Sequence, residues 1–348
     1  MPKRILALIL TFAALLSCAV FPVRAEGIFP SVSAKSAILI DADSERVLLE
    51  KNACLRLPMA STTKIMTALV ALERGDPDDT VTITADSVGI EGSSIYLTLG
   101  EELTLKELLY ALLLASANDA ATAIAIHISG SVDAFASLMN EKAAELSLTD
   151  THFENPHGLD SKDHYTTAYD LARITAAALK NKTLAEIVST YKYNISGNRT
   201  LVNHNKLLRQ YDGCIGVKTG YTKSDGRCLV SAARRDGMTL IAVTLSAPDD
   251  WRDHSAMLDY GFRYYEAVRL CNQREVIITL PDVSKSGNTI ECVAERGLAL
   301  TLPRGGEIEK RVECPRFFWS TPKKGEVIGQ IIYYRNGKEI AKIRLLAK

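Results

Sequence analysis

The chain has 348 residues, of which 47% are hydrophobic and 24% are charged, so it is long enough for two domains with a sizeable core. Its 41 basic and 41 acidic side chains leave no net charge. This balance does not suggest the basic patch that nucleic-acid binding requires, and we expect no nucleic-acid partner.

The first 25 residues have the pattern of an export signal. Lys3-Arg4 precedes an apolar stretch from Ile5 to Val20, and Val23-Arg24-Ala25 resembles a cleavage site. The apolar stretch is short for a transmembrane helix. We therefore predict a signal peptide over residues 1–25 and an exported mature chain, located at the cell wall, at the outer face of the cytoplasmic membrane, or secreted. An uncleaved anchor and a lipoprotein modified at Cys18 are the alternatives.

The first candidate catalytic motif is Ser61-Thr62-Thr63-Lys64. An apolar run with helical spacing follows it from Ile65 to Leu72, and Gly75 ends the run. Residues three apart share a helix face, so Lys64 would face the Ser61 hydroxyl. A lysine that is desolvated and near another cation can act as a base. Taken alone, the pattern is also typical of a capped helix with a surface lysine.

The second motif, Ser116-Ala117-Asn118, lies between two predicted helices. The first helix begins with a capping box, Thr104 to Glu107, and the second runs from Ala120 to Ile128. Such a tight connection can aim polar side chains into a cleft. The alternative is that Ser116 and Asn118 only satisfy the ends of the helices.

The third motif, Lys218-Thr219-Gly220, lies just ahead of two β-rich runs, Cys228–Ala232 and Leu240–Leu245. Turn residues between the runs predict consecutive antiparallel strands. A glycine in a strand often marks the close approach of another backbone. An exposed strand edge can bind an extended peptide, whose negative group Lys218 and Thr219 would meet. A hairpin with a solvated lysine is the alternative.

Each motif is weak by itself, because the same spacings recur elsewhere: Ser189/Lys192, Ser320/Lys323, Ser196/Asn198 and Ser286/Asn288. Context distinguishes the first motif, since only Ser61 is followed by a sustained apolar helix. Together, in this order, the motifs supply what acyl transfer through a serine needs: a nucleophile, lysines that manage protons, a relay hydroxyl and a strand that holds a peptide. The sequence therefore predicts an enzyme.

The motifs resemble the S-x-x-K, S-D-N and K-T-G signature of the penicillin-recognising serine acyltransferases. Within that group the chain resembles the serine-type D-alanyl-D-alanine carboxypeptidases, which are low-molecular-mass penicillin-binding proteins. The resemblance extends from about Ala37 to Ala267 and includes Asn155–Asp160 and Ala168–Leu171. Ala117 favours the carboxypeptidases over the lactamases. No Glu-x-x-Leu-Asn occurs between the second and third motifs, which disfavours rapid β-lactam hydrolysis.

The resemblance implies the following catalytic roles. Ser61 would attack the carbonyl between the two terminal D-alanines of a peptidoglycan stem peptide, and Lys64 would take its proton. Ser116 and Lys218 would relay a proton to the leaving D-alanine. Penicillin would bind covalently to Ser61, as a β-lactam inhibitor. No cofactor is implied.

The resemblance also implies a set of substrate-binding residues. Asn118 would orient the substrate amide, and the backbone N–H groups of Ser61 and Tyr221 would form an oxyanion hole. Thr219 would bind the terminal carboxylate with the help of an arginine, for which Arg252 is our candidate. The other members of the substrate-binding set are Lys218 and Gly220. His157 and His164 are expected to serve structure, and no metal is expected.

The predicted activity is removal of the terminal D-alanine from stem pentapeptides. The alternatives are a D,D-endopeptidase that acts on cross-links and a penicillin- or wall-binding protein with weak turnover. Six cysteines would remain after cleavage, and an even number permits disulfides in an exported protein. Cys214 and Cys228 would pair if the strands between them fold back on each other, and we state this as a hypothesis.

The resemblance implies an α/β (α+β) catalytic domain of the β-lactamase/transpeptidase-like type over residues 26–267, with helices packed around an antiparallel sheet. Short β-rich runs that alternate with turns predict a small all-β domain over residues 268–348, with a spacer or docking role. The segment from Ile340 to Lys348 alternates like a final strand. Too little chain follows it for an amphipathic membrane helix, so membrane association stays open.

Overall fold

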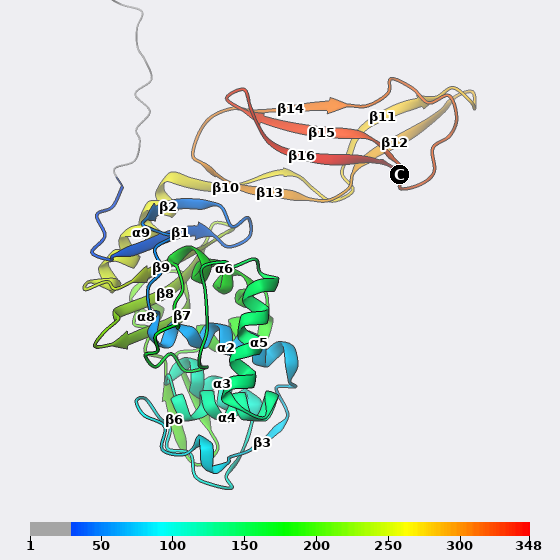
Figure 1. The fold of residues 1–348 in the computed structure, drawn as a ribbon. Helices are drawn as coiled ribbons and strands as arrows, with labels where there is room; N and C mark the ends of the chain where they lie inside the picture. The colour runs from blue at the N-terminus through cyan, green and yellow to red at the C-terminus, as the bar shows by residue number, and fades with distance from the viewer. Residues whose placement is uncertain (1–28) are drawn as a thin grey trace, which may run out of the picture.

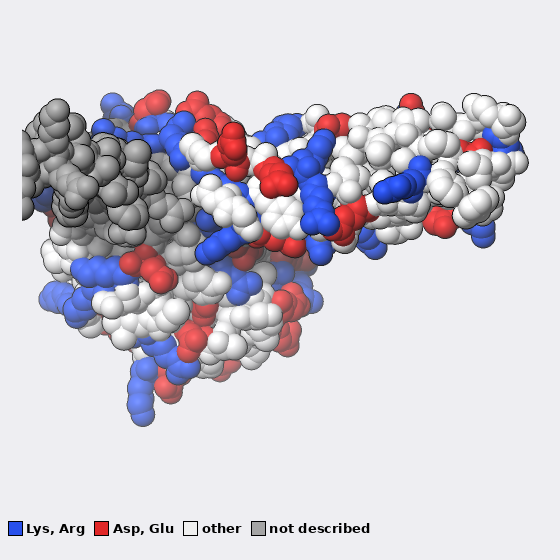
Figure 2. All heavy atoms as spheres, turned by 90° about the horizontal axis from the view of Figure 1, so that it is seen from above, with Lys and Arg blue, Asp and Glu red and all other residues white. Residues whose placement is uncertain are grey.

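The computed structural model describes residues 29–348, which form a mixed domain of helices and strands followed by an elongated β domain (Figure 1). The predicted signal peptide and Cys18 lie outside these residues. Basic and acidic side chains are interspersed over the described surface visible in Figure 2. Within residues 29–348 no single helix is long and apolar enough to cross a membrane, although the bent pair formed by α4 (Asn118–Ser129) and α5 (Val132–Glu145) meets those criteria jointly.

The mixed domain is built on a five-stranded antiparallel sheet with the order β2-β1-β9-β8-β7. Its strands are β1 (Ser36–Asp41), β2 (Val47–Lys51), β7 (Cys214–Thr222), β8 (Gly226–Arg235) and β9 (Met238–Leu245). Every residue of β9 is buried, because helices cover both faces of the central strands. The predicted antiparallel strands around the third motif are confirmed, and β7 lies at the edge of this sheet.

The larger hydrophobic core packs one face of this sheet against a group of helices. The helical elements of the mixed domain are η1 (Ala60–Thr63), α2 (Lys64–Arg74), η2 (Ala85–Ser87), α3 (Leu105–Leu114), α4 (Asn118–Ser129), α5 (Val132–Glu145), α6 (Ala168–Leu179), α7 (Lys182–Ser189), α8 (Leu207–Gln210) and α9 (Asp250–Tyr264). Helix α9 packs on the opposite face, over a second core. Two small hairpins complete the domain: β3 (Thr80–Thr82) with β4 (Glu102–Thr104), and β5 (Lys192–Ile195) with β6 (Arg199–Val202).

The start of α3 confirms the predicted capping box. Thr104 Oγ1 accepts a hydrogen bond from the Glu107 N–H at 3.1 Å, and the Glu107 carboxylate accepts one from the Thr104 N–H at 2.9 Å. Such a cap contributes about 1 kcal/mol to helix stability. The helix then buries its leucines and ends at Leu114, three residues short of Asn118, where α4 begins. Ser116 and Ala117 of the second motif therefore lie in the connection, as predicted, and Asn118 is the first residue of α4.

The C-terminal region is an all-β domain with its own core, as predicted. Strand β10 (Tyr265–Cys271) pairs with β13 (Leu298–Pro303). The second sheet has the order β11-β12-β16-β15-β14, formed by Val276–Asp282, Asn288–Ala294, Lys338–Ala347, Val327–Arg335 and Ile308–Glu313 respectively. The predicted final strand is thus β16. Figure 1 shows this domain projecting beside the β1–β2 end of the mixed domain.

The proposed Cys214–Cys228 disulfide is wrong. In the β7–β8 ladder Cys214 pairs with Ala233, whereas Cys228 pairs with Gly220. The two cysteines therefore lie toward opposite ends of the hairpin, about 20 Å apart at about 3.3 Å per residue, whereas a disulfide needs Cα atoms within about 7 Å. All six described cysteines are free thiols.

Candidate active site

Ser61 lies in the 3-10 turn η1, which runs directly into α2, in agreement with the predicted first turn of a core helix. The turn is held from several sides. The Ala60 N–H donates to the Asp225 carboxylate at 3.0 Å, and Thr63 Oγ1 donates to the Ala60 carbonyl at 2.8 Å. Ala60 adopts a φ of +46°, a region that residues other than glycine rarely occupy. These contacts fix the position of the Ser61 hydroxyl.

Lys64 is completely buried, and its ammonium group points at Ser61. Its Nζ donates to Ser61 Oγ at 3.0 Å, to Asn118 Oδ1 at 2.7 Å and to the carbonyl of His157. Burial lowers the pKa of Lys64 well below its ordinary value, and the charge of Lys218 lowers it further. A neutral amine in this position can accept a proton from the serine.

A second serine and lysine lie beside the first pair. Ser116, in the α3–α4 connection, accepts a hydrogen bond from Lys218 Nζ at 3.1 Å. Lys218, from β7, also donates to the carbonyl of Thr219 at 2.8 Å. Burial lowers the pKa of Lys218 to about 7, so this side chain can exchange protons near neutral pH.

These residues surround a cleft of about 370 Å³. Of the predicted site residues, Ser61, Ser116, Thr219, Gly220 and Tyr221 line it. The others that come together here are Lys64, Asn118 and Lys218, which reach the serines through the hydrogen bonds given above. A Cβ atom on Gly220 would lie 3.0 Å from the Ser61 nitrogen, so the glycine permits the close approach of β7 to η1 that the sequence predicted.

Arg252, our candidate for the substrate carboxylate, lies outside the cleft lining. Its side chain is 83% exposed and lies 3.7 Å from Asp249, the residue that precedes α9. Arg227 lines the cleft instead. Its Nε donates at 2.9 Å to Asp250, whose side chain is 3% exposed, and its guanidinium group lies 5.7 Å from the ring of Trp251. The arginine that lines the cleft is therefore contributed by β8.

Sequence reasoning also missed further cleft residues: Ser93, His204, Lys206, Asp250 and Trp251. The signal for Arg227 was the turn sequence Ser224-Asp225-Gly226, which sets the hairpin register and pairs Arg227 with Tyr221. Ser93, His204 and Lys206 come from irregular segments, and Asp250 and Trp251 begin α9. No local sequence pattern indicates that these residues lie in the cleft.

The two histidines near the first motif form hydrogen bonds within the fold, and His157 Nδ1 accepts one from the Leu159 N–H at 3.2 Å. His164 Nε2 lies 2.8 Å from Thr63 Oγ1, and its Nδ1 accepts a hydrogen bond from the Glu154 N–H at 3.0 Å. Burial lowers the pKa of His157 to about 3 and that of His164 to about 4, so both rings are neutral at physiological pH. Over residues 29–348 there is no group of three or more histidine, cysteine, aspartate or glutamate side chains that could hold a metal ion.

A fixed serine hydroxyl, two buried lysines that hydrogen-bond to serines, and an open strand edge define a serine acyl-transferring enzyme. The D-alanyl-D-alanine carboxypeptidase family model matches residues 23–249, and the model of the C-terminal domain of penicillin-binding protein 5 matches residues 265–348. The chain therefore belongs to the D-alanyl-D-alanine carboxypeptidase family.

Named relatives agree with this assignment over most of the chain. The chain is 34% identical over 330 residues to the D-alanyl-D-alanine carboxypeptidase DacF of Bacillus subtilis. The matched region covers 90% of this chain and 85% of DacF. It is 32% identical over 329 residues to DacC of Escherichia coli, with 89% and 82% covered. Among solved structures, penicillin binding protein 5 from Haemophilus influenzae superposes with a TM-score of 0.78 at 30% identity, covering 91% of this chain and 97% of that one.

The contact between Gly158 and η1 gives a test of how the turn is held. Gly158 has a φ of +84°, and a Cβ atom on it would overlap the carbonyl of Ala60. We expect Gly158→Ala to destabilise the fold by about 2–4 kcal/mol, from backbone strain and steric overlap together. Gly130→Ala is the matched control, because Gly130 has a φ of +82° with open space around it, and strain alone costs about 1 kcal/mol. Urea unfolding measures both, and equal losses would contradict this account of the contact.

Proposed function

We propose that this chain, a serine-type D-alanyl-D-alanine carboxypeptidase of peptidoglycan metabolism that binds penicillin, acts through an acyl-enzyme on Ser61. The single observation that carries the proposal is the 3.0 Å hydrogen bond from the buried amine of Lys64 to Ser61 Oγ. No other described lysine combines complete burial, a pKa well below its ordinary value and contact with a serine hydroxyl in the first turn of a helix.

Acylation begins with proton transfer. Neutral Lys64 takes the proton of Ser61, and Oγ attacks the carbonyl carbon of the penultimate D-alanine. The carbonyl oxygen becomes an oxyanion, which accepts hydrogen bonds from the backbone N–H groups of Ser61 and Tyr221, each contributing about 3 kcal/mol. The close approach of β7 to η1 at Gly220 supports this pairing of donors.

Release of D-alanine needs a proton on its nitrogen. Ser116 Oγ donates this proton to the nitrogen, and Lys218 then returns a proton to Ser116 Oγ through the 3.1 Å hydrogen bond between the two side chains. Because burial brings the pKa of Lys218 to about 7, the lysine can give and regain a proton at neutral pH. Water then hydrolyses the ester on Ser61 and frees the shortened peptide. A β-lactam acylates the same oxygen.

The stem peptide binds along the edge of β7, with Asn118 orienting its amide and Thr219 contacting its terminal carboxylate. Arg227 replaces Arg252 as the arginine that binds this carboxylate. Asp250, which is buried, holds the guanidinium group of Arg227 beside the cleft. An arginine and a carboxylate form strong charge-assisted hydrogen bonds, which gives the site a preference for a free C-terminus.

We also propose that the chain is exported by residues 1–25 and works at the cell wall on stem peptides that end in D-Ala-D-Ala. Residues 26–267 would be the catalytic unit. Residues 268–348 would act as a spacer or docking domain. The separate hydrophobic core of the C-terminal sheets supports this division.

Ser61→Ala tests the acyl-enzyme. We expect release of D-alanine from a synthetic peptide ending in Lys-D-Ala-D-Ala to fall at least about a thousandfold, because no other group can form the ester. Ser189→Ala is the matched control, since Ser189 also precedes a lysine by three residues but only donates to the Glu186 carbonyl. Undiminished release by Ser61→Ala would refute the mechanism. Cleavage of cross-linked dimers by a wild-type protein that leaves the pentapeptide intact would favour an endopeptidase.

Arg227→Gln and Arg252→Gln distinguish the two arginines. We expect Arg227→Gln to lower kcat/KM for a free-acid substrate about 10- to 100-fold, which is the effect of losing one charge-assisted hydrogen bond. The Arg227→Gln variant should also lose the preference for a peptide with a free C-terminal carboxylate over the same peptide with a C-terminal amide. Arg252→Gln should change kcat/KM less than about twofold, because its side chain points into solvent. The reverse ranking of the two variants would place the carboxylate near α9 instead.

A further inference from the structure

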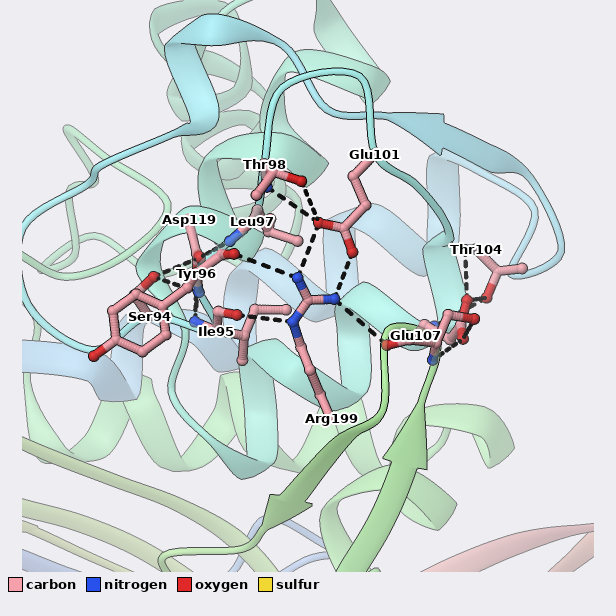
Figure 3. Close-up of polar contacts among 11 residues, drawn as sticks. Ser94, Ile95, Tyr96, Leu97, Thr98, Glu101, Thr104, Glu107, Asp119 and Arg199 are labelled. Carbon is pink, nitrogen blue, oxygen red and sulfur yellow. Dashed lines mark hydrogen bonds and ion pairs between the residues drawn. The ribbon is translucent and has the colours of Figure 1, made fainter.

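A loop beside the cleft, residues 91–101, has no regular secondary structure between η2 and β4. Tyr96 is 83% exposed at its tip and adopts a φ of +60°, which a bulky side chain rarely does. A strained conformation of this kind persists only when surrounding contacts impose it. Figure 3 shows that two charged side chains, Asp119 and Arg199, supply those contacts from outside the loop.

Asp119 holds the loop from the side of the helices. Its buried carboxylate accepts hydrogen bonds from Ser94 Oγ at 2.6 Å and from the N–H groups of Ile95 and Leu97 at 3.2 and 3.1 Å. Because Asp119 follows Asn118 on α4, this anchor ties the loop to the second motif.

Arg199, on β6, holds the same loop from the opposite side (Figure 3). Its Nε donates to the Ile95 carbonyl at 2.9 Å, and its Nη2 donates to the Tyr96 carbonyl at 3.3 Å. The guanidinium group also binds both carboxylate oxygens of Glu101, with Nη2 to Oε2 at 2.9 Å, and this hydrogen bonding lowers the pKa of Glu101. One planar group therefore joins the tip of the loop to its end, which only the fork of an arginine can do.

The inner end of the loop reaches the catalytic lysine through Asn118. The carbonyl of Glu91 accepts from Asn118 Nδ2 at 2.6 Å, and the carbonyl of Ser93 accepts from the Asn118 N–H at 2.7 Å. With Nδ2 occupied in this way, Asn118 Oδ1 faces Lys64 Nζ at 2.7 Å. A rotated amide would present its donor to the lysine instead, so the loop sets the orientation of this contact.

We propose that Arg199 is a positioning residue for acylation: by clamping residues 95–101 it fixes the carbonyls of Glu91 and Ser93, and through Asn118 it holds Lys64 in line with Ser61. This inference rests on the proposed roles of Ser61 and Lys64. The alternative is that the Arg199–Glu101 ion pair only stabilises the fold, since both side chains are partly buried, at 21% and 17% exposure.

Stopped-flow measurement of acylation by benzylpenicillin distinguishes a positioning role of Arg199 from a purely stabilising one. We expect Arg199→Met to lower the limiting acylation rate about 10- to 100-fold, as a small displacement of a catalytic group does, while the half-saturating penicillin concentration changes less than about twofold. Glu101→Gln should lower the limiting rate in the same direction by a smaller factor. Arg173→Met is the matched control, because Arg173 forms a partly exposed ion pair at 2.9 Å with Glu45, which lies on the β1–β2 turn. The Arg173→Met variant should be acylated at the wild-type rate.

Rate constants measured on the fraction that acylates do not depend on how much protein is folded, so a less stable variant still gives an answer. A limiting rate for Arg199→Met within twofold of that for Arg173→Met would overturn the proposal, and so would a loss confined to the half-saturating concentration. Acylation of the Ser61→Ala variant at the wild-type rate would instead contradict the proposed function. Failure of the Arg199 proposal and failure of the proposed function are therefore distinguishable.

Discussion

The burial of two lysines side by side is the constraint on which the rest of the catalytic domain depends. Water is excluded from Lys64 and Lys218, and each charge would repel the other. A buried ammonium group without partners is strongly unfavourable. The fold therefore surrounds the two amines with oxygen acceptors, while burial lowers the pKa of both, to about 7 for Lys218.

Those acceptors come from parts of the chain that are far apart in sequence. The turn η1 supplies Ser61 beside Lys64, and the α3–α4 connection supplies Ser116. Asn118, the first residue of α4, and the carbonyl of His157, in the loop after α5, supply the others. The central sheet holds them together because β1 pairs with β9, and β9 in turn carries β8 and β7. The edge position of β7 then leaves one side of the strand open toward the cleft, where a peptide can pair with it.

The elements that follow local rules could be predicted from the sequence. The helix after Ser61, the capping box of Thr104 and Glu107, and the strands around Lys218 depend on spacing and turn residues that a single segment contains. The ion pairs of Arg227 and Arg199 could not be predicted in this way, because their partners Asp250 and Glu101 lie 23 and 98 positions away. The Cys214–Cys228 hypothesis failed for a related reason, since closeness in sequence says nothing of register until the turn at Gly226 is fixed.

Direct titration of Lys64 is the measurement that tests the central claim. The side-chain carbon and nitrogen resonances of isotopically labelled lysine can be followed by NMR over pH, with Lys64→Arg used to assign the signal. The account predicts that Lys64 loses its proton at a pH well below the ordinary lysine value of about 10.4, and that Lys218→Met raises the pKa of Lys64 by removing a neighbouring charge. A Lys64 that titrates at the ordinary value, unaffected by Lys218→Met, would contradict the claim that burial prepares it as the base for Ser61.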